Sequence, residues 1–238
     1  VEAHNLAYAE SRQTYEGTQI IRGVAFVRER YFVMVDQLTS QDNEEHEYRY
    51  RTHAFAGYDL GGEVTLQEYG PHIKRDTGAL EIFTASTSGA CAVEEPSYTP
   101  LFIPHVHQLI SGAGDHKVTD SVTTGIAPDF LSILAPYKIG QTSGPDAPLR
   151  VTPVSVSNGS AWLIESEDYT DIAWIREAGS PQTLETPTGE TISTDAYFSL
   201  VSLTDSLAMI SRGNYLNLGE SVIIASADSS GADIKTTP

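Results

Sequence analysis

Apolar and polar residues alternate with a period of two through much of the chain, the pattern typical of β-strands with one buried face. Thr18–Arg28 and Arg30–Asp36 are rich in β-branched and aromatic residues, and only Glu29 separates them. We therefore predict two strands joined by a tight turn. Further strand-like runs are His46–Ala56, Glu63–Tyr69, Ala79–Ala85, Phe130–Ala135, Leu149–Val156, Ala161–Glu165, Asp171–Arg176, Tyr197–Leu203, Ser206–Arg212 and Ser221–Ala225.

Turn-forming residues separate these runs, and helical patterns are nearly absent. Gly and Pro recur between the strands, as in Gly61-Gly62, Ser143-Gly144-Pro145 and Asn158-Gly159. Strands spaced about 8–12 residues apart favour a sandwich or a barrel. We predict an all-β fold in which two stacked antiparallel sheets form a large β-sandwich over residues 1–226. We expect a flexible polar tail at 227–238.

The segment Thr87–Asp129 is the least strand-like part of the chain, and we expect it to form a long excursion over the edge of the sandwich. It carries His105, His107 and His116. Alternate residues of a strand point to one side, so His105 and His107 are placed to share one metal ion. The alternative is a surface strand whose histidines bind nothing.

The charge balance excludes one class of partner. Lys and Arg number 14 against 32 Asp and Glu, for a net charge of −18. Because Lys and Arg dominate affinity for phosphates, we expect no nucleic-acid partner. No apolar run approaches the roughly 20 residues that span a bilayer, so we expect no membrane partner. The chain opens at Val1 without a signal-peptide pattern, which suggests either a removed leader or a piece of a longer protein.

Motifs of hydrolytic and nucleotide-dependent enzymes are absent from the sequence. There is no G-x-S-x-G and no glycine-rich phosphate loop. The single Cys91 has no catalytic context and excludes an internal disulfide. We expect no cofactor for chemistry.

The first 51 residues combine aromatic and cationic side chains against an acidic background. The candidates for binding are Tyr8, Arg12, Arg22, Tyr48 and Arg49. Aromatic faces stack on sugar rings, and Arg binds carboxylates or sulfates through two hydrogen bonds, so these residues suit a saccharide surface. Ordinary cross-strand pairing of Tyr and Arg, which stabilises a sheet without any ligand, explains them equally well.

Several short motifs occur in the order found in a known family. They are Tyr15-Glu16-Gly17, the strand pair from Arg22 to Asp36, His46-Glu47-Tyr48 with His53, Phe130–Tyr137, and Thr194-Asp195-Ala196. This series resembles the C-terminal β-sandwich region of heparinase II/III-like polysaccharide lyases, including the alginate lyases of that superfamily. The resemblance spans most of the chain, from Tyr15 to about Gly219.

The resemblance implies an activity and a set of roles. Such enzymes cleave uronate-containing polysaccharides by β-elimination, in which a base removes the proton α to the uronate carboxylate. Tyr15 best matches the catalytic Tyr of the sandwich, with Tyr8 second. His46 matches a landmark that often binds a structural divalent metal, zinc or calcium, and His4 is the other candidate ligand. The resemblance also implies a periplasmic or secreted location.

Two functional hypotheses follow, and a third is weaker. The first is a lyase sandwich that supplies Tyr15 to a site completed by an α/α toroid domain absent from this chain, without which it is inactive. The alternative is a non-catalytic carbohydrate-binding or scaffolding module. The third is a purely structural β-domain. The exposure of three side chains, Tyr15, Tyr48 and Arg49, separates these hypotheses. A structural role needs the three side chains to be packed, whereas a binding or catalytic site leaves them lining a groove.

Overall fold

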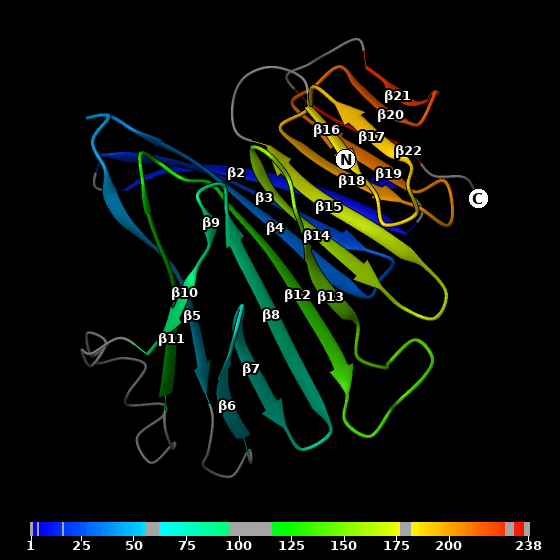
Figure 1. Ribbon diagram of the computed structural model, residues 1–238. Coiled ribbons are helices and arrows are strands. Elements are labelled where there is room, and N and C mark those ends of the chain that lie inside the picture. Colours follow the sequence, from blue (N-terminus) through cyan, green and yellow to red (C-terminus); the bar gives the residue numbers. More distant parts are fainter. Residues whose placement is uncertain are drawn as a thin grey trace.

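The computed structural model describes residues 2–3, 5–15, 17–55, 62–95, 116–176, 182–226 and 231–235. Within these ranges the secondary structure consists of antiparallel strands in four sheets (Figure 1). The predicted all-β fold with stacked antiparallel sheets is confirmed. None of the described residues forms a helix long and apolar enough to cross a membrane.

The largest sheet, sheet A, contains nine strands. Its hydrogen-bonded order is β1-β2-β3-β4-β12-β8-β7-β6, with β9 paired to β8. The strands are β1 (Glu2–Ala3), β2 (Leu6–Tyr15), β3 (Thr18–Val27), β4 (Tyr31–Ser40), β6 (Gly62–Gln67), β7 (Gly70–Arg75), β8 (Gly78–Ser86), β9 (Gly89–Ala90) and β12 (Phe130–Lys138).

The predicted tight turn around Glu29 is confirmed between β3 and β4. Arg28 and Glu29 have positive φ angles of 55° and 54°, a backbone region that tight hairpin turns commonly use. The turn sets the register, so that Val27 pairs with Tyr31 and Arg22 pairs with Asp36.

The smallest sheet, sheet B, crosses the outer face of sheet A. Its order is β10 (Ala92–Glu94), β11 (His116–Gly125) and β5 (His46–Phe55). Tyr50 of β5 contacts sheet A, because its hydroxyl lies 3.5 Å from Met34 Sδ and its ring centroid lies 6.1 Å from that of Phe130. We expected Thr87–Asp129 to form a long excursion over the sandwich edge, but within that segment residues 116–125 form β11, which pairs with β5. His105 and His107 lie outside the described residues.

Sheet C packs on the inner face of sheet A. Its strands are β13 (Arg150–Val154), β14 (Gly159–Glu165), β15 (Thr170–Arg176), β18 (Phe198–Ser202), β19 (Ala208–Ser211) and β22 (Ala232–Lys235). Strand β22 pairs with β19, so the expectation of a flexible tail is wrong for these four residues. A polar composition did not prevent pairing, because β19 offered an open edge.

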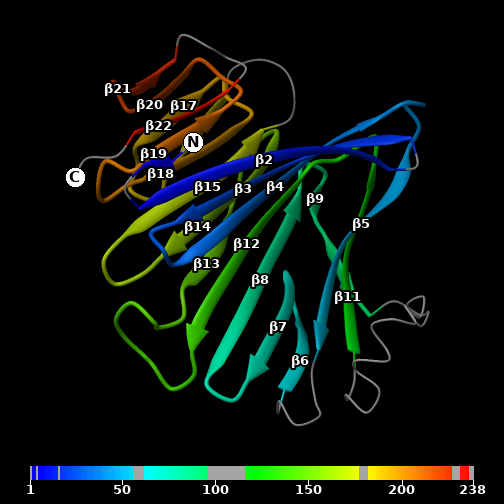
Figure 2. The same ribbon diagram turned by 180° about the vertical axis from the view of Figure 1, so that it is seen from behind.

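Sheet D contains β16 (Gln182–Glu185), β17 (Thr191–Thr194), β20 (Tyr215–Leu218) and β21 (Ser221–Ala225). One apolar cluster, with Val33, Leu131 and Trp162, joins sheets A and C. A second, with Trp174 and Leu216, joins sheets C and D. Sheet C is therefore buried on both faces, and the fold has a layer beyond the two that the sequence predicts (Figures 1 and 2).

Candidate functional site

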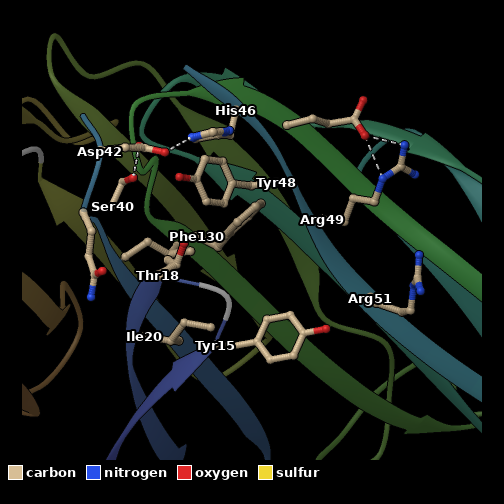
Figure 3. Close-up of a pocket in the computed structure, with 14 residues that line it drawn as sticks. Tyr15, Thr18, Ile20, Ser40, Asp42, His46, Tyr48, Arg49, Arg51 and Phe130 are labelled. Atoms are coloured by element: carbon tan, nitrogen blue, oxygen red, sulfur yellow. Dashed lines mark hydrogen bonds and ion pairs between the residues drawn. The ribbon is translucent and has the colours of Figure 1, made fainter. Parts of the chain in front are cut away.

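A groove of about 740 Å³ lies between one end of sheet A and strand β5 (Figure 3). It is open to solvent on the side where Tyr15 ends β2 and where the β4–β5 hairpin projects. The lining residues are Tyr15, Gly17, Thr18, Ile20, Leu38, Ser40, Gln41, Asp42, His46, Glu47, Tyr48, Arg49, Arg51 and Phe130.

Strand periodicity brings these residues together. Tyr15 pairs with Thr18, and Ile20 pairs with Leu38, so all four side chains share the outer face of sheet A. The inner face carries alternate residues such as Ile21, which is buried. After the hairpin at residues 41–45, β5 returns across the outer face. Apart from Phe130 of β12, the groove lining comes from one continuous part of the chain, residues 15–51.

The two groove tyrosines have different surroundings. Tyr15 is 65% exposed, and its ring lies beside the start of β3 (Figure 3). Tyr48 is half-buried, and its hydroxyl oxygen is inaccessible to solvent and without a hydrogen-bond partner among the described residues. Figure 3 shows that hydroxyl directed toward the Ser40–Asp42 side of the groove. The groove therefore contains an unsatisfied polar group next to an exposed aromatic ring.

The β4–β5 hairpin supplies an aspartate–histidine pair. His46 Nε2 lies 2.8 Å from Asp42 Oδ2. Asp42 Oδ1 accepts hydrogen bonds from Ser40 Oγ at 2.6 Å and from the backbone N–H of Glu44 at 3.1 Å. These hydrogen bonds, with that of His46, lower the pKa of Asp42 to about 2. The carboxylate is consequently ionised at physiological pH.

The metal prediction gains no support from this geometry. His46 is paired with Asp42, and His4 lies outside the described residues. In the described part of the chain, no group of three or more His, Cys, Asp or Glu side chains is placed to hold a metal ion.

Both groove arginines are bound to carboxylates. Arg49 contacts Glu47 at 2.5 Å, Glu94 at 2.6 Å and Asp120 at 3.0 Å. Arg51 binds both oxygens of Asp120, each at 2.7 Å. Burial opposes ionisation of Asp120, but its hydrogen bonds to the two arginines outweigh this effect and lower its pKa. These ion pairs tie β5 to β10 and β11.

The remaining predicted residues lie outside the groove lining. Arg22 binds Asp36 through two hydrogen bonds of 2.6 Å and lies 5.8 Å from the centre of the Tyr50 ring. Arg12 pairs with Ile21 and is on the opposite face of sheet A from Tyr15. Thus the structure brings together Tyr15, His46, Tyr48 and Arg49, but not Arg12 or Arg22.

Tyr8 lies between sheets A and C. Its hydroxyl donates to Glu10 Oε2 at 3.1 Å and lies 3.4 Å from Ser211 Oγ, and its ring stacks on Phe198 with centroids 6.4 Å apart. Burial raises its pKa to about 12. This position suits packing between sheets.

Three residues that line the groove, Ser40, Asp42 and Phe130, were not among the binding residues predicted from the sequence. Asp42 is exposed at the β4–β5 hairpin, where it lines the groove and binds His46. The spacing of Ser40, Asp42 and His46 was the available signal. Phe130, noted only as part of a motif, forms part of the lining.

Comparison with protein-family models and with curated proteins found no match. The functional assignment therefore depends on the chain's own geometry.

Proposed function

We propose that this chain is a non-catalytic glycan-binding module whose ligand lies in the groove between sheet A and β5. The observation that carries the proposal is the solvent-inaccessible Tyr48 hydroxyl, which has no hydrogen-bond partner in the described protein. Leaving a buried polar group unsatisfied costs about 1–3 kcal/mol. A ligand hydroxyl would remove that cost once neighbouring groove side chains move aside, because the oxygen is enclosed in the unliganded protein.

The other groove residues suit a sugar. A pyranose ring has an apolar face and a polar rim, and the exposed Tyr15 ring offers an aromatic surface for the apolar face. Asp42 and His46 provide polar groups at the opposite side. The volume of about 740 Å³ lies within the roughly 300–1,000 Å³ of typical ligand pockets.

A lyase sandwich is the second candidate, favoured by the exposure of Tyr15 at the groove mouth, where a toroid domain has room to approach. In this proposal the Tyr15 phenolate removes the proton α to the uronate carboxylate, and the glycosidic oxygen then leaves. A phenol near pKa 10 needs a cationic neighbour to act as a base. Arg22, one candidate for that role, is bound to Asp36.

The two candidates give different results in one assay. Hexasaccharides of neutral and uronate sugars, immobilised on an array, are probed with wild-type protein, Tyr48→Phe and, as a control, Tyr215→Phe in distant sheet D. Glycan binding by wild type that weakens about tenfold in Tyr48→Phe alone supports the binding module. Absence of binding to every glycan contradicts it. Unsaturated uronate products, detected by ultraviolet absorbance when an α/α toroid domain is supplied with the chain, would instead indicate a lyase.

A further inference from the structure

The cations of the groove are already neutralised by the protein. Arg49 and Arg51 are the Lys or Arg side chains among the lining residues. Arg49 has carboxylate oxygens of Glu47, Glu94 and Asp120 within 3.0 Å. Arg51 uses Nε and Nη2 to bind Asp120, which is the bidentate geometry that it would otherwise offer to a ligand carboxylate.

The burial of Asp120 makes it unfavourable for a ligand carboxylate to replace Asp120 as the partner of Arg49 and Arg51. Its side chain is fully buried, whereas the side chains of Arg49 and Arg51 are about one-third exposed (32% and 29%). If a ligand carboxylate drew both arginines away, the buried Asp120 charge would lose its partners. An uncompensated buried charge is strongly unfavourable. The arginines therefore serve to hold sheet B together.

The local charge also disfavours anions. Around the groove the carboxylates of Asp42, Glu47, Glu94 and Asp120 outnumber the guanidinium groups of Arg49 and Arg51. The net charge of the whole chain, −18, has the same sign. Salt screens such repulsion only beyond a Debye length of about 8 Å, so a bound uronate experiences it.

We infer that the groove binds glycans that carry no carboxylate or sulfate groups. This inference rests on the proposed glycan-binding function and names its ligand class. It reverses the interpretation of Arg49 as a residue that binds ligand anions. Recognition then depends on the Tyr15 ring, the Tyr48 hydroxyl and the polar groups of the hairpin, which do not require a charged ligand.

Pairs of oligosaccharides that differ in charge test whether the groove prefers uncharged glycans. Titration calorimetry at about 0.15 M salt compares hexamers of glucose, mannose and galactose with the corresponding glucuronate, mannuronate and galacturonate hexamers. We expect at least one neutral hexamer to bind about tenfold tighter or more than its uronate counterpart. Equal or tighter binding of the uronates overturns the inference but leaves glycan binding intact. No binding of any hexamer overturns both.

A charge variant tests whether the arginine–carboxylate network causes the preference for neutral glycans. Glu94 does not line the groove but contacts Arg49, so Glu94→Gln frees part of that guanidinium. We expect the ratio of uronate to neutral affinity to rise about threefold. The control is Glu185→Gln, which makes the same charge change on β16 in sheet D. We expect this variant to leave the ratio of uronate to neutral affinity unchanged. Equal shifts in the two variants, or no shift in Glu94→Gln, contradict the assigned role of the arginine–carboxylate network.

Discussion

The interface between sheets A and C and the groove beside sheet B use the same residue types with different outcomes. At the interface, Arg28 binds Asp171 through two hydrogen bonds of 2.8 and 2.9 Å, and the Tyr31 hydroxyl donates to Asp171 at 2.8 Å. In the groove, the arginines are likewise bound to a buried Asp120, but no residue in the described part of the chain hydrogen-bonds to the Tyr48 hydroxyl.

The missing partner does not by itself mark a site, because the hydroxyl of Tyr169, whose ring packs against Arg28 and Tyr31 at the interface, also lacks a hydrogen-bond partner among the described residues; what distinguishes Tyr48 is its position in the groove lining. Buried polar groups in folded proteins are almost always hydrogen-bonded, so an exception calls for a physical explanation. Tyr31 is fully buried and satisfied, and its pKa is raised well above the ordinary value by burial and by the neighbouring Asp171. Tyr48 lies at a groove that a ligand can enter. The Asp171 network stabilises the fold, whereas under the proposed function the Tyr48 hydroxyl gains its partner from a ligand.

The largest expected effect comes from breaking the interface network. Asp171→Ala leaves Arg28, whose side chain is only 13% exposed, without its buried partner. We expect the free energy of unfolding to fall by about 3–5 kcal/mol, measured by urea denaturation. Asp205 also binds Arg28 but is 46% exposed, so Asp205→Ala should cost about 1 kcal/mol or less. Equal losses in the two variants would contradict the scaffold role of Asp171.

The pH dependence of stability distinguishes a buried carboxyl from a groove carboxyl. Burial raises the pKa of Asp129 to about 7. Its folded form then binds a proton that the unfolded form has lost, so stability falls as pH rises from about 4 to 7, by roughly 2–4 kcal/mol. Asp129→Asn retains an oxygen to accept the Leu38 N–H bond and should remove this dependence. A wild-type pH profile that the variant leaves unchanged would refute the assignment.

Asp42 should show the opposite sign. Its folded pKa of about 2 lies below the ordinary value because of hydrogen bonds from Ser40, Glu44 and His46. The stability that it contributes is present above about pH 4 and is lost as pH falls toward 2. Comparison of Asp42→Asn with wild type by urea denaturation across this range checks the prediction. The prediction is supported if Asp42→Asn is less stable than wild type above pH 4 and equally stable near pH 2.

The exposed ring of Tyr15 should matter for binding more than for folding. Tyr15→Ala removes the stacking surface, and we expect about tenfold weaker binding of a neutral hexasaccharide. Its exposure of 65% predicts a stability change within about 0.5 kcal/mol. Tyr15→Phe retains the ring and should retain binding. If the chain cleaves uronates when a toroid domain is supplied, loss of that cleavage in Tyr15→Phe would instead favour the lyase proposal.

Local sequence patterns predicted the strands better than they predicted the layers. Alternation identified β3 and β4, whose buried apolar residues lie on one face. The apolar run Ala161–Ile164 predicted a strand but not a sheet covered on both faces, because burial on the second face depends on sheet D. Strand β22 alternates apolar and polar residues, and Ala232 and Ile234 pack against the core, but four residues are too short a pattern to predict a strand.

The candidate site was predictable where its residues are near in sequence. Tyr15 ends β2, and His46, Tyr48 and Arg49 lie on β5, with only β3 and β4 between them in the chain; all four line one groove. The pairing of Arg49 with Asp120 was not predictable, because it depends on the register between β5 and β11. The Arg22–Asp36 pair follows from the β3–β4 turn, which places the two residues opposite each other.

The most direct test of the central claim measures stability and glycan binding together in Tyr48→Phe and Tyr31→Phe. For Tyr48→Phe we predict about tenfold weaker binding with an unfolding free energy that is unchanged or about 1 kcal/mol higher, because an unsatisfied hydroxyl is removed. For Tyr31→Phe we predict a loss of about 1.5–3 kcal/mol in stability and unchanged binding. Undiminished binding by Tyr48→Phe, or a stability loss matching that of Tyr31→Phe, would contradict the account.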